Sequence, residues 1–188
     1  VSHTFYTQHT EEFYDFYKNK MIFLDAKPNK AHLKLAEMEQ AGKLSAIVTQ
    51  NIDGLHQAAG SKNVFELHGS VHRNYCQKCG KFFDVNYVVN AKGVPYCDEC
   101  GGIIKPDVVL YEEGLDSQTI NGAVRAISKA DMLIIGGTSL VVYPAAGMID
   151  YFKGKYLVVL NRDATSRDKQ ADLCITDPIG EVLGRIRV

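Results

Sequence analysis

Residues 132–140 read MLIIGGTSL, a short apolar run that ends at two consecutive glycines and two hydroxyl side chains. Similar runs recur along the chain: AIVT (46–49), VFEL (64–67), DVVLY (107–111) and YLVVL (156–160). Helix-like segments such as SQTINGAVRAISKA (117–130) separate some of them. Short runs rich in branched apolar residues are typical of parallel strands that are buried on both faces. The alternation therefore predicts a doubly wound α/β domain.

Polar or glycine-rich groups follow four of these five runs. In open α/β sheets, ligands bind outside the carboxyl ends of the strands, so we expect these groups to converge on one crevice. A Gly-Gly-Thr-Ser loop before a helix can offer N–H groups and hydroxyls to a phosphate, and an Asn after a later strand can bond a ribose. The groups are Gln50–Gly54, His68–Gly69, Gly136–Ser139 and Asn161–Asp163.

Each of these groups also has a purely structural interpretation. Residues 50–54 can form a capped turn with Asp53 and Gly54 at its corner. His68 can be a hydrogen-bonded core histidine, and Asn161 can be a turn residue. Their joint placement at strand ends favours a ligand site.

Two further segments predict helices near the start of the chain. The segment EEFYDFYKNKMIFL (11–24) is helix-like and is broken by Pro28. The segment NKAHLKLAEMEQAGK (29–43) has amphipathic spacing, with Asn29 as its N-cap and Gly42 as its stop. We expect His32 on the surface of this helix or at the edge of the core.

Two Cys-x-x-Cys-Gly pairs, 17 residues apart, predict a zinc module over about residues 73–105. Four thiolates hold zinc at Zn–S distances of about 2.3 Å and leave no open position, so the zinc would be structural. So small a module has too few apolar residues to fold without such a staple. Two disulfides or a redox dithiol are the alternatives, and Cys174 is expected to be a small core residue. The predicted ligands are Cys76, Cys79, Cys97 and Cys100.

The composition excludes several classes of protein. The 188 residues are 46% hydrophobic with a net charge of −1, which is ordinary for a globular chain and gives no polybasic surface for nucleic acid or membrane. No apolar run approaches the roughly 18 to 20 residues of a membrane span. The first residues, VSHTFYTQHTEEFY, do not form a secretory signal. Because the cysteine pattern is not a dense disulfide framework, we expect a cytoplasmic protein.

The chain resembles the sirtuins, which are NAD-dependent protein lysine deacylases, and most closely their bacterial members. The resemblance rests on TQNIDGLHQAAGS (49–61), ELHGS (66–70), the two cysteine pairs and GTSLVVYPAAG (137–147), which occur in family order and spacing over essentially the whole chain. It implies a Rossmann-like domain made of residues 1–72 and 106–188, with the zinc module of residues 73–105 inserted. We expect a monomer with an acyl-lysine peptide as partner, and no direct contact with nucleic acid or membrane.

The resemblance also implies roles for individual residues. His68 would be the catalytic general base, with Asn51 and Asp53 lining the nicotinamide and ribose pocket. The acyl-lysine peptide would bind as an added strand between segments 109–114 and 141–143. The other residues expected to contact NAD are Gln50, Ile52, Gly137, Thr138, Ser139, Asn161 and Arg162. The residues expected to contact the peptide are Val109, Tyr111, Glu112 and Val142.

The implied reaction begins when the acyl-lysine oxygen attacks the ribose carbon that bears nicotinamide, which then leaves. The histidine takes a proton from a ribose hydroxyl, that hydroxyl attacks the acyl carbon, and water completes the release of lysine and O-acyl-ADP-ribose. Histidine suits this step because imidazole accepts and releases protons near neutral pH. An NAD-dependent mono-ADP-ribosyltransferase and an inactive, zinc-stapled acyl-lysine-binding relative are the alternatives.

Three departures from the family pattern stand out. The family's opening βα unit, with Gly-Ala-Gly-x-Ser and Pro-Asp-Phe-Arg, has no counterpart here, and we expect it to precede Val1 in the whole protein. Glu112 replaces a common Gly, where it either favours basic peptides or points to solvent. Lys105 replaces a common Arg and cannot make the same bidentate contact. The acyl-chain preference, the protein substrates and the effect of Glu112 do not follow from the sequence.

Overall fold

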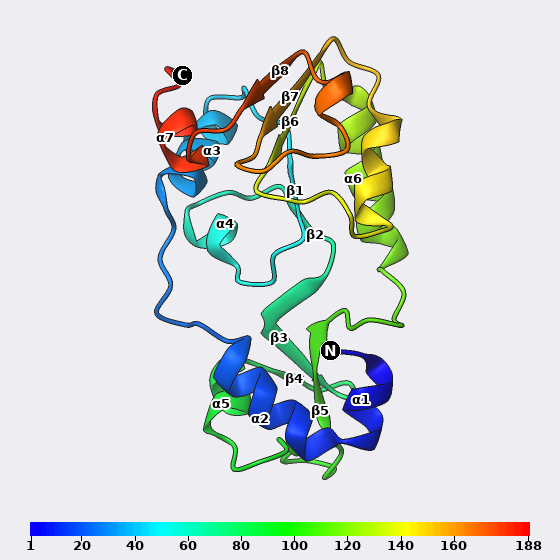
Figure 1. Cartoon of the computed structure of the whole chain (residues 1–188). Coiled ribbons are helices and arrows are strands. Elements are labelled where there is room, and N and C mark those ends of the chain that lie inside the picture. The colour runs from blue at the N-terminus through cyan, green and yellow to red at the C-terminus, as the bar shows by residue number, and fades with distance from the viewer. The chain divides into compact units, whose positions relative to one another are not determined.

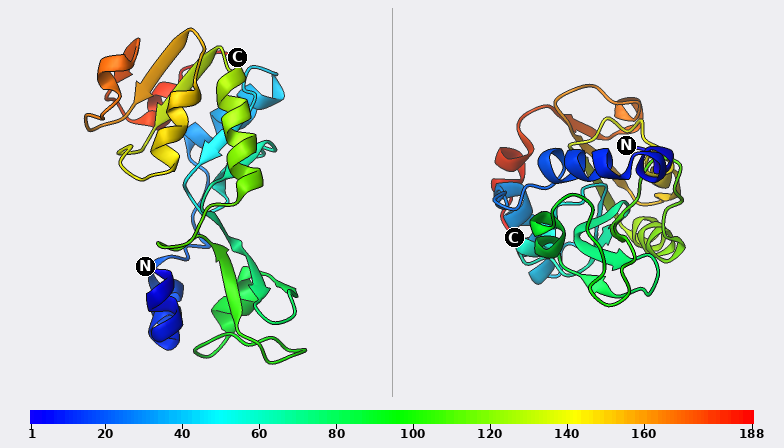
Figure 2. Two further views of the ribbon diagram at one scale, coloured as in Figure 1. Left: turned by 90° about the vertical axis from the view of Figure 1, so that its right-hand side faces the viewer. Right: turned by 90° about the horizontal axis from the view of Figure 1, so that it is seen from below.

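The computed structural model describes residues 1–188, which divide into two compact units. The first, here called the cysteine unit, comprises Val1–Ala26, Gln50–Gly54 and Glu66–Asp116. The second, the sheet unit, comprises Lys27–Thr49, Leu55–Phe65 and Ser117–Val188. The N-terminus belongs to the cysteine unit and the C-terminus to the sheet unit (Figures 1 and 2).

The sheet unit contains the predicted parallel sheet. Strands β6 (Met132–Gly136), β7 (Tyr156–Leu160) and β8 (Leu173–Ile175) lie in that order, and both neighbouring pairs are parallel. Strands β1 (Ile47–Thr49) and β2 (Val64–Glu66) pair in a separate two-stranded sheet. The predicted runs at 132–135 and 156–160 are therefore confirmed as parallel strands.

Both faces of this parallel sheet are covered, as expected for a doubly wound fold. On one face, Ile134, Val158 and Leu160 pack with residues of α3 (Lys30–Gln40) and α7 (Ile179–Gly184). The alternate residues Ile135, Leu157 and Val159 pack on the other face with Ile149 and Phe152, at the 3-10 helix η1 (Ala145–Tyr151). Helix α6 (Ser117–Lys129) packs beside η1. The remaining short helices of this unit are α4 (Leu55–Ala58) and the 3-10 helix η2 (Asp168–Gln170).

The cysteine unit is built on an antiparallel sheet of order β4-β3-β5. Its strands are β3 (Gly69–Cys76), β4 (Phe82–Phe83) and β5 (Ile104–Val108). Helices α1 (His3–Gln8), α2 (Thr10–Lys20) and α5 (Val85–Asn90) complete the unit (Figures 1 and 2). The core includes Phe13, Tyr14, Tyr17, Val88 and Ile104, each at most 1% exposed.

The predicted division at residues 73–105 rests on sequence and stays a prediction. The compact unit that holds the cysteines is wider, because α1 and α2 supply aromatic side chains to the same core as Cys76, Cys97 and Ile104. The aromatic residues of α2 include Phe13 and Tyr14, whose rings pack edge to face at 5.1 Å between centroids. A single core thus joins the start of the chain to the cysteine pairs.

Two expectations from the sequence are wrong. The run 107–111 was expected to be a parallel strand, but its first residues belong to β5, which pairs antiparallel with β3. A continuous apolar run has the same appearance in either kind of sheet when both faces are covered. Cys174 was expected in the core, but it is exposed, because β8 is the last strand in its sheet.

Helix α3 begins and ends as predicted. The Asn29 side chain accepts hydrogen bonds from the backbone N–H groups of Ala31 (2.9 Å) and His32 (3.2 Å). Gly42 follows the C-cap with a φ of +70°, the left-handed conformation that ends many helices at glycine. His32 is half-buried and joins the N-terminal capping box through its ring nitrogen.

Replacing Asn29 with Ala should lower the free energy of unfolding by about 1 kcal/mol, because two N–H groups of α3 lose their acceptor. Urea unfolding followed by far-UV circular dichroism measures this difference. Asn29→Ser is the matched control, because its hydroxyl oxygen can still accept, and it should lose less than half as much. Equal losses in both variants would contradict the capping role.

Candidate functional site

A break in strand register shapes the region around residues 50–54. Strand β3 pairs Ser70 with Asp107 and Asn74 with Pro106, so residues 71–73 bulge out of the ladder. Asn74 is fully buried, and its side-chain amide donates to the carbonyls of Val71 (3.2 Å) and Phe83 (3.3 Å). Bulges of this kind commonly re-aim side chains next to functional sites.

The bulge holds the segment Gln50–Gly54 in place. The Val71 N–H donates to the Ile52 carbonyl at 3.0 Å, and His72 Nε2–H donates to the Asp53 carbonyl at 3.0 Å. Gly54 has a φ of +70°, and a Cβ on it would lie 2.8 Å from His72 Cδ2. Glycine is therefore required there by both conformation and space.

His68 contacts the same segment through its ring. Its Nδ1 lies 3.0 Å from the carbonyl oxygen of Gln50. A carbonyl oxygen only accepts, so Nδ1 carries the proton and Nε2 of the neutral ring keeps a lone pair. The structure thus brings His68 together with the Gln50–Asp53 segment, as the strand-end argument predicted.

Gly69 fixes the position of the histidine backbone. Its φ is +75°, and a Cβ at this position would lie 1.9 Å from the carbonyl oxygen of Asp107. The Val109 N–H donates to the His68 carbonyl at 3.0 Å. These contacts hold His68 between the start of β3 and the end of β5.

Arg73 joins three segments beside this histidine. Its guanidinium donates to the carboxylates of Glu66 (2.6 Å) and Asp107 (2.7 Å). Burial alone would lower the pKa of Arg73, but hydrogen bonds and charge from both carboxylates raise it above its ordinary value. The Glu66 side chain is only 8% exposed, so this pair stabilises a largely buried carboxylate two residues before His68.

The segment expected to bind peptide follows β5. Val109 is half-buried, whereas Tyr111 is 69% exposed. Glu112 has a φ of +78°, and its carboxylate accepts hydrogen bonds from Thr4. Of the two alternatives left open for Glu112, a side chain that only points to solvent does not fit, because Thr4 of helix α1 donates to this exposed carboxylate.

The other predicted residues lie in the sheet unit, at the carboxyl ends of β6 and β7. These two strands are parallel, so Gly137, Thr138 and Ser139 share a sheet edge with Asn161 and Arg162. The Gly137 N–H donates to the Leu160 carbonyl at 3.2 Å, and the Asn161 side-chain amide donates to the Asp163 carbonyl at 2.8 Å. Gly137 has a φ of +62°, and no atom lies within 4 Å of where a Cβ would stand. A ligand can therefore approach this backbone closely, as nucleotide phosphates require.

Val142 is the predicted peptide residue of the sheet unit. It is half-buried between exposed Val141 and Tyr143, which are 69% and 71% exposed. Exposed apolar side chains next to one another are common where proteins bind partners.

Sequence reasoning missed His72, Val71 and Arg73. They follow His68 in the stretch HGSVHRNYC, and the missed signal is that polar residues interrupt an otherwise strand-like stretch.

Two shallow hollows of about 340 and 330 Å³ lie elsewhere, the first at Tyr87 and Tyr96, the second at Phe65 and Arg125.

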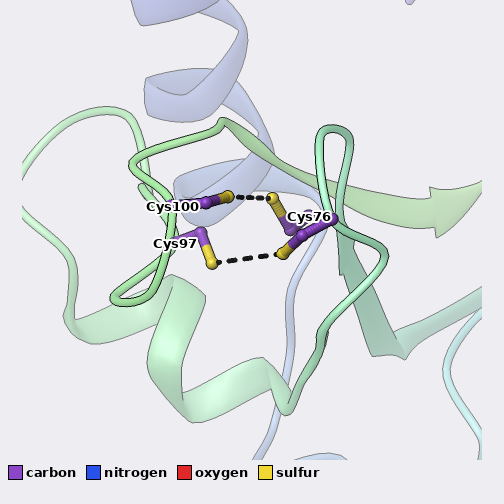
Figure 3. Close-up of side chains that lie close together, drawn as sticks. Cys76, Cys97 and Cys100 are labelled. Carbon is purple, nitrogen blue, oxygen red and sulfur yellow. Dashed lines mark hydrogen bonds between the residues drawn. The ribbon is translucent and has the colours of Figure 1, made fainter.

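The four paired cysteines form a site for one metal ion. Their sulfurs all lie within 4.8 Å of one another, with Cys76 Sγ 3.4 Å from Cys100 Sγ and Cys79 Sγ 3.7 Å from Cys97 Sγ. Tetrahedral zinc with Zn–S bonds of about 2.3 Å needs sulfurs about 3.8 Å apart. In Figure 3, Cys76, Cys97 and Cys100 point toward one another from two turns of the chain. The donor set therefore fits one structural zinc ion, and the alternative of two disulfides is not seen, since all five cysteines are free.

The two turns are built alike. In each, the Gly after the second cysteine has a positive φ, +75° at Gly80 and +68° at Gly101. The N–H of each Gly donates to the carbonyl of the first cysteine of its pair, at 2.9 and 3.0 Å. Lys81 lies between the turns and forms ion pairs of 2.8 Å with Asp98 and Glu99. None of the helices combines the length and the apolar composition that a membrane span requires.

Comparison with known proteins gives consistent matches. A model of the Sir2 family matches residues 1–144. An NAD-dependent protein deacetylase of Clostridium acetobutylicum is 66% identical over 184 residues, which is 97% of this chain and 75% of that protein.

Two solved structures are also similar. A Sir2 complex with a p53 peptide and NAD+ has a TM-score of 0.91 at 40% identity, over 98% of this chain and 79% of that one. A Sir2 complex with an inhibitor, 2'-O-acetyl-ADP-ribose and a deacetylated p53 peptide has a TM-score of 0.91 at 42% identity. The match covers 98% of this chain and 81% of that one.

Replacing Cys97 with Ser should abolish zinc binding and unfold the cysteine unit. Structural zinc contributes on the order of 10 kcal/mol, as much as the whole stability of a typical domain. Zinc content by atomic absorption and near-UV circular dichroism, which reports the buried tyrosines of a chain without tryptophan, measure both effects. Cys174→Ser, outside the cluster, should keep one zinc per chain. A zinc-free Cys97→Ser protein with an unchanged near-UV spectrum would contradict the structural role.

Proposed function

This chain belongs to the Sir2 family, and from that membership we infer that it is an NAD-dependent protein deacetylase. Relatives of that name align over nearly its whole length at up to 66% identity. Similar solved structures hold NAD+, acetylated peptides or acetyl-ADP-ribose. The substrates are an acetylated lysine in a protein or peptide and NAD, and the acetyl group is transferred to ADP-ribose.

The observation that carries this proposal is the hydrogen bond between His68 and the Gln50 carbonyl. Because Nδ1–H is the donor, the lone pair of Nε2 is available to take a proton. A general base needs a lone pair that points toward the proton it removes, and this geometry is the first requirement, ahead of the pKa of the base. We propose His68 as the general base that takes a proton from a ribose hydroxyl of bound NAD.

NAD, when bound, supplies the ribose that accepts the acetyl group and nicotinamide as the leaving group. In the cysteine unit, we propose that Asn51 and Asp53 line the nicotinamide and ribose pocket. The contacts of Val71 and His72 hold this segment before any ligand arrives. In the sheet unit, the open backbone at Gly137 supports phosphate binding. The remaining proposed NAD contacts are Gln50, Ile52, Thr138, Ser139, Asn161 and Arg162.

The acetyl-lysine peptide is proposed to bind as an extra strand. Tyr111 and Tyr143 are among the most exposed large side chains, on segments 109–114 and 141–143. An added strand gains affinity from backbone hydrogen bonds and specificity from alternate side chains. The proposed contacts are Val109, Tyr111, Glu112 and Val142.

The zinc ion has a structural role in this proposal. Four thiolates complete its tetrahedral shell, so no position is open for a water or carbonyl oxygen. We also propose the cytoplasm as the compartment, because a four-thiolate site needs reduced cysteines.

The test of the function is product analysis with NAD and an acetyl-lysine peptide on the full-length protein. A deacetylase releases nicotinamide only when the acetylated peptide is present, and the peptide loses the mass of one acetyl group. A gain of ADP-ribose mass on the peptide or the protein would favour the transferase alternative. Peptide binding without NAD consumption would favour the binding-module alternative.

Replacing His68 with Ala should lower the rate of deacetylation by about 10²- to 10⁴-fold, the usual contribution of a general base. The rate is measured by mass spectrometry of the peptide, with the melting temperature as a check of folding. His9→Ala, at an exposed position of the same unit, should deacetylate at the rate of the unaltered protein. A folded His68→Ala protein of normal activity would show that the base is another group.

A further inference from the structure

The chain turns sharply immediately after the segment proposed to bind peptide. The Glu113 N–H donates to the Leu110 carbonyl at 3.0 Å, so residues 110–113 form a β-turn. Glu112 is its third residue and has a φ of +78°. A positive φ at this position alone is the pattern of a type II turn, which favours Gly or Asn there. A glutamate persists in such a conformation only when its surroundings compensate for the strain.

Helix α1 provides that compensation. One carboxylate oxygen of Glu112 accepts from the Thr4 backbone N–H at 2.9 Å and from the Thr4 hydroxyl at 2.7 Å. Hydrogen bonds from the Thr4 side chain and backbone, with the nearby charge of His3, lower the pKa of Glu112 below its ordinary value. The same helix end is capped by Ser2, whose hydroxyl accepts from Phe5 N–H at 3.1 Å. Glu112 therefore takes an N–H of the first turn that the cap itself does not satisfy.

The neighbouring carboxylate tightens the same turn. Glu113 accepts from the Leu110 N–H at 2.9 Å, from His3 Nδ1 at 2.8 Å and from Lys105 Nζ at 3.1 Å. Burial alone would raise the pKa of Glu113, but these three donors lower it. Lys105 thus reaches the turn with a single ammonium, at the position where the family commonly has Arg.

The backbone of the segment is also paired with the start of the chain. The His3 N–H donates to the Tyr111 carbonyl at 2.9 Å, and the Tyr111 N–H donates to the Val1 carbonyl at 3.1 Å. At the other end of the segment, the Val109 N–H donates to the His68 carbonyl. The segment 109–111 therefore runs from the proposed base to the strained turn, and residues 1–3 at the start of the chain are paired with it at Tyr111.

We propose that Glu112 is a positioning residue, whose contact with Thr4 holds the 110–113 turn so that the segment 109–111 is preformed for the acetyl-lysine peptide. This inference rests on the proposed function. A segment whose backbone is already held in place by such hydrogen bonds loses less conformational freedom when a peptide binds against it. The carboxylate acts through α1 and not by attracting a basic peptide.

Glu112→Ala tests this role, because it keeps the strained φ and removes both hydrogen bonds. We expect the KM for an acetyl-lysine peptide to rise at least about fivefold, since the binding-competent conformation becomes a minor one. The kcat and the KM for NAD should change less than about twofold, a split that a general loss of stability would not produce. Glu112→Gln keeps an acceptor oxygen and should restore most of the affinity. Glu11→Ala removes an exposed carboxylate from the same unit and should leave every constant unchanged.

Thr4→Val weakens the contact between Thr4 and Glu112, here called the tether, and leaves Glu112 with its strained φ unchanged. It removes the hydroxyl donor and keeps the N–H, so we expect a KM increase of about twofold. In a double-mutant cycle, Thr4→Val should add no further increase to Glu112→Ala, because both act on one contact. Independent, multiplying effects would contradict a shared tether.

The choice of peptide separates positioning from direct charge attraction. Peptides with basic and with neutral residues beside the acetyl-lysine should lose affinity by the same factor in Glu112→Ala. A loss of affinity confined to the basic peptide would overturn this inference and leave the proposed function standing. An unchanged KM in a Glu112→Ala enzyme that still turns over would do the same. Absence of any peptide-dependent nicotinamide release by the unaltered protein would overturn the proposed function and this inference with it.

Discussion

The pairing of β3 with β5 is the constraint on which the cysteine unit depends. At one end of this ladder, Cys76 pairs with Ile104, so the strands begin and end next to metal ligands. At the other end, Gly69 pairs with Val108, directly beside His68. A zinc ion at the first end holds the two strands together on one side of the bulge at residues 71–73, and the pairs of Gly69 and Ser70 hold them together on the other side, next to His68. The metal, which has no open coordination position, therefore has a structural role in holding the strand that follows His68.

Irregular backbone gathers where this ladder meets the proposed site. The bulge at residues 71–73 breaks the regular pairing, and its freed groups bind the segment 50–54. Gly69 approaches the Asp107 carbonyl more closely than any side chain would allow. Glu112 occupies a left-handed conformation beside the peptide segment. Strained or irregular elements persist where surrounding contacts over-determine them, and here they hold the groups that we propose to act on a ligand.

Sequence alone predicted those features that have a local cause. The strands at 132–136 and 156–160, the caps of α3 and the four clustered cysteines all follow from spacing and residue type. Strand β3 was not predicted because its longer partner, β5, lies beyond the second cysteine pair in sequence and because its bulge interrupts any alternation. The exposure of Cys174 was not predicted because it depends on which strand lies at the edge of the sheet. The order of the strands cannot be read from the sequence of a single strand. The contact of Glu112 with Thr4 joins residues 108 positions apart, beyond the reach of local pattern.

The hydrogen bond to the Gln50 carbonyl keeps the proton of the neutral His68 ring on Nδ1 and leaves Nε2 as the proposed base. Nitrogen NMR of protein labelled with ¹⁵N-histidine measures the tautomer directly, and a spectrum of the His68→Gln variant assigns this residue among the six histidines. The structure predicts a protonated Nδ1 and an unprotonated Nε2 in the neutral ring. A neutral ring with its proton on Nε2 would contradict this assignment, because Nδ1 would then have no proton to donate to the Gln50 carbonyl and Nε2 would have no lone pair with which to accept one.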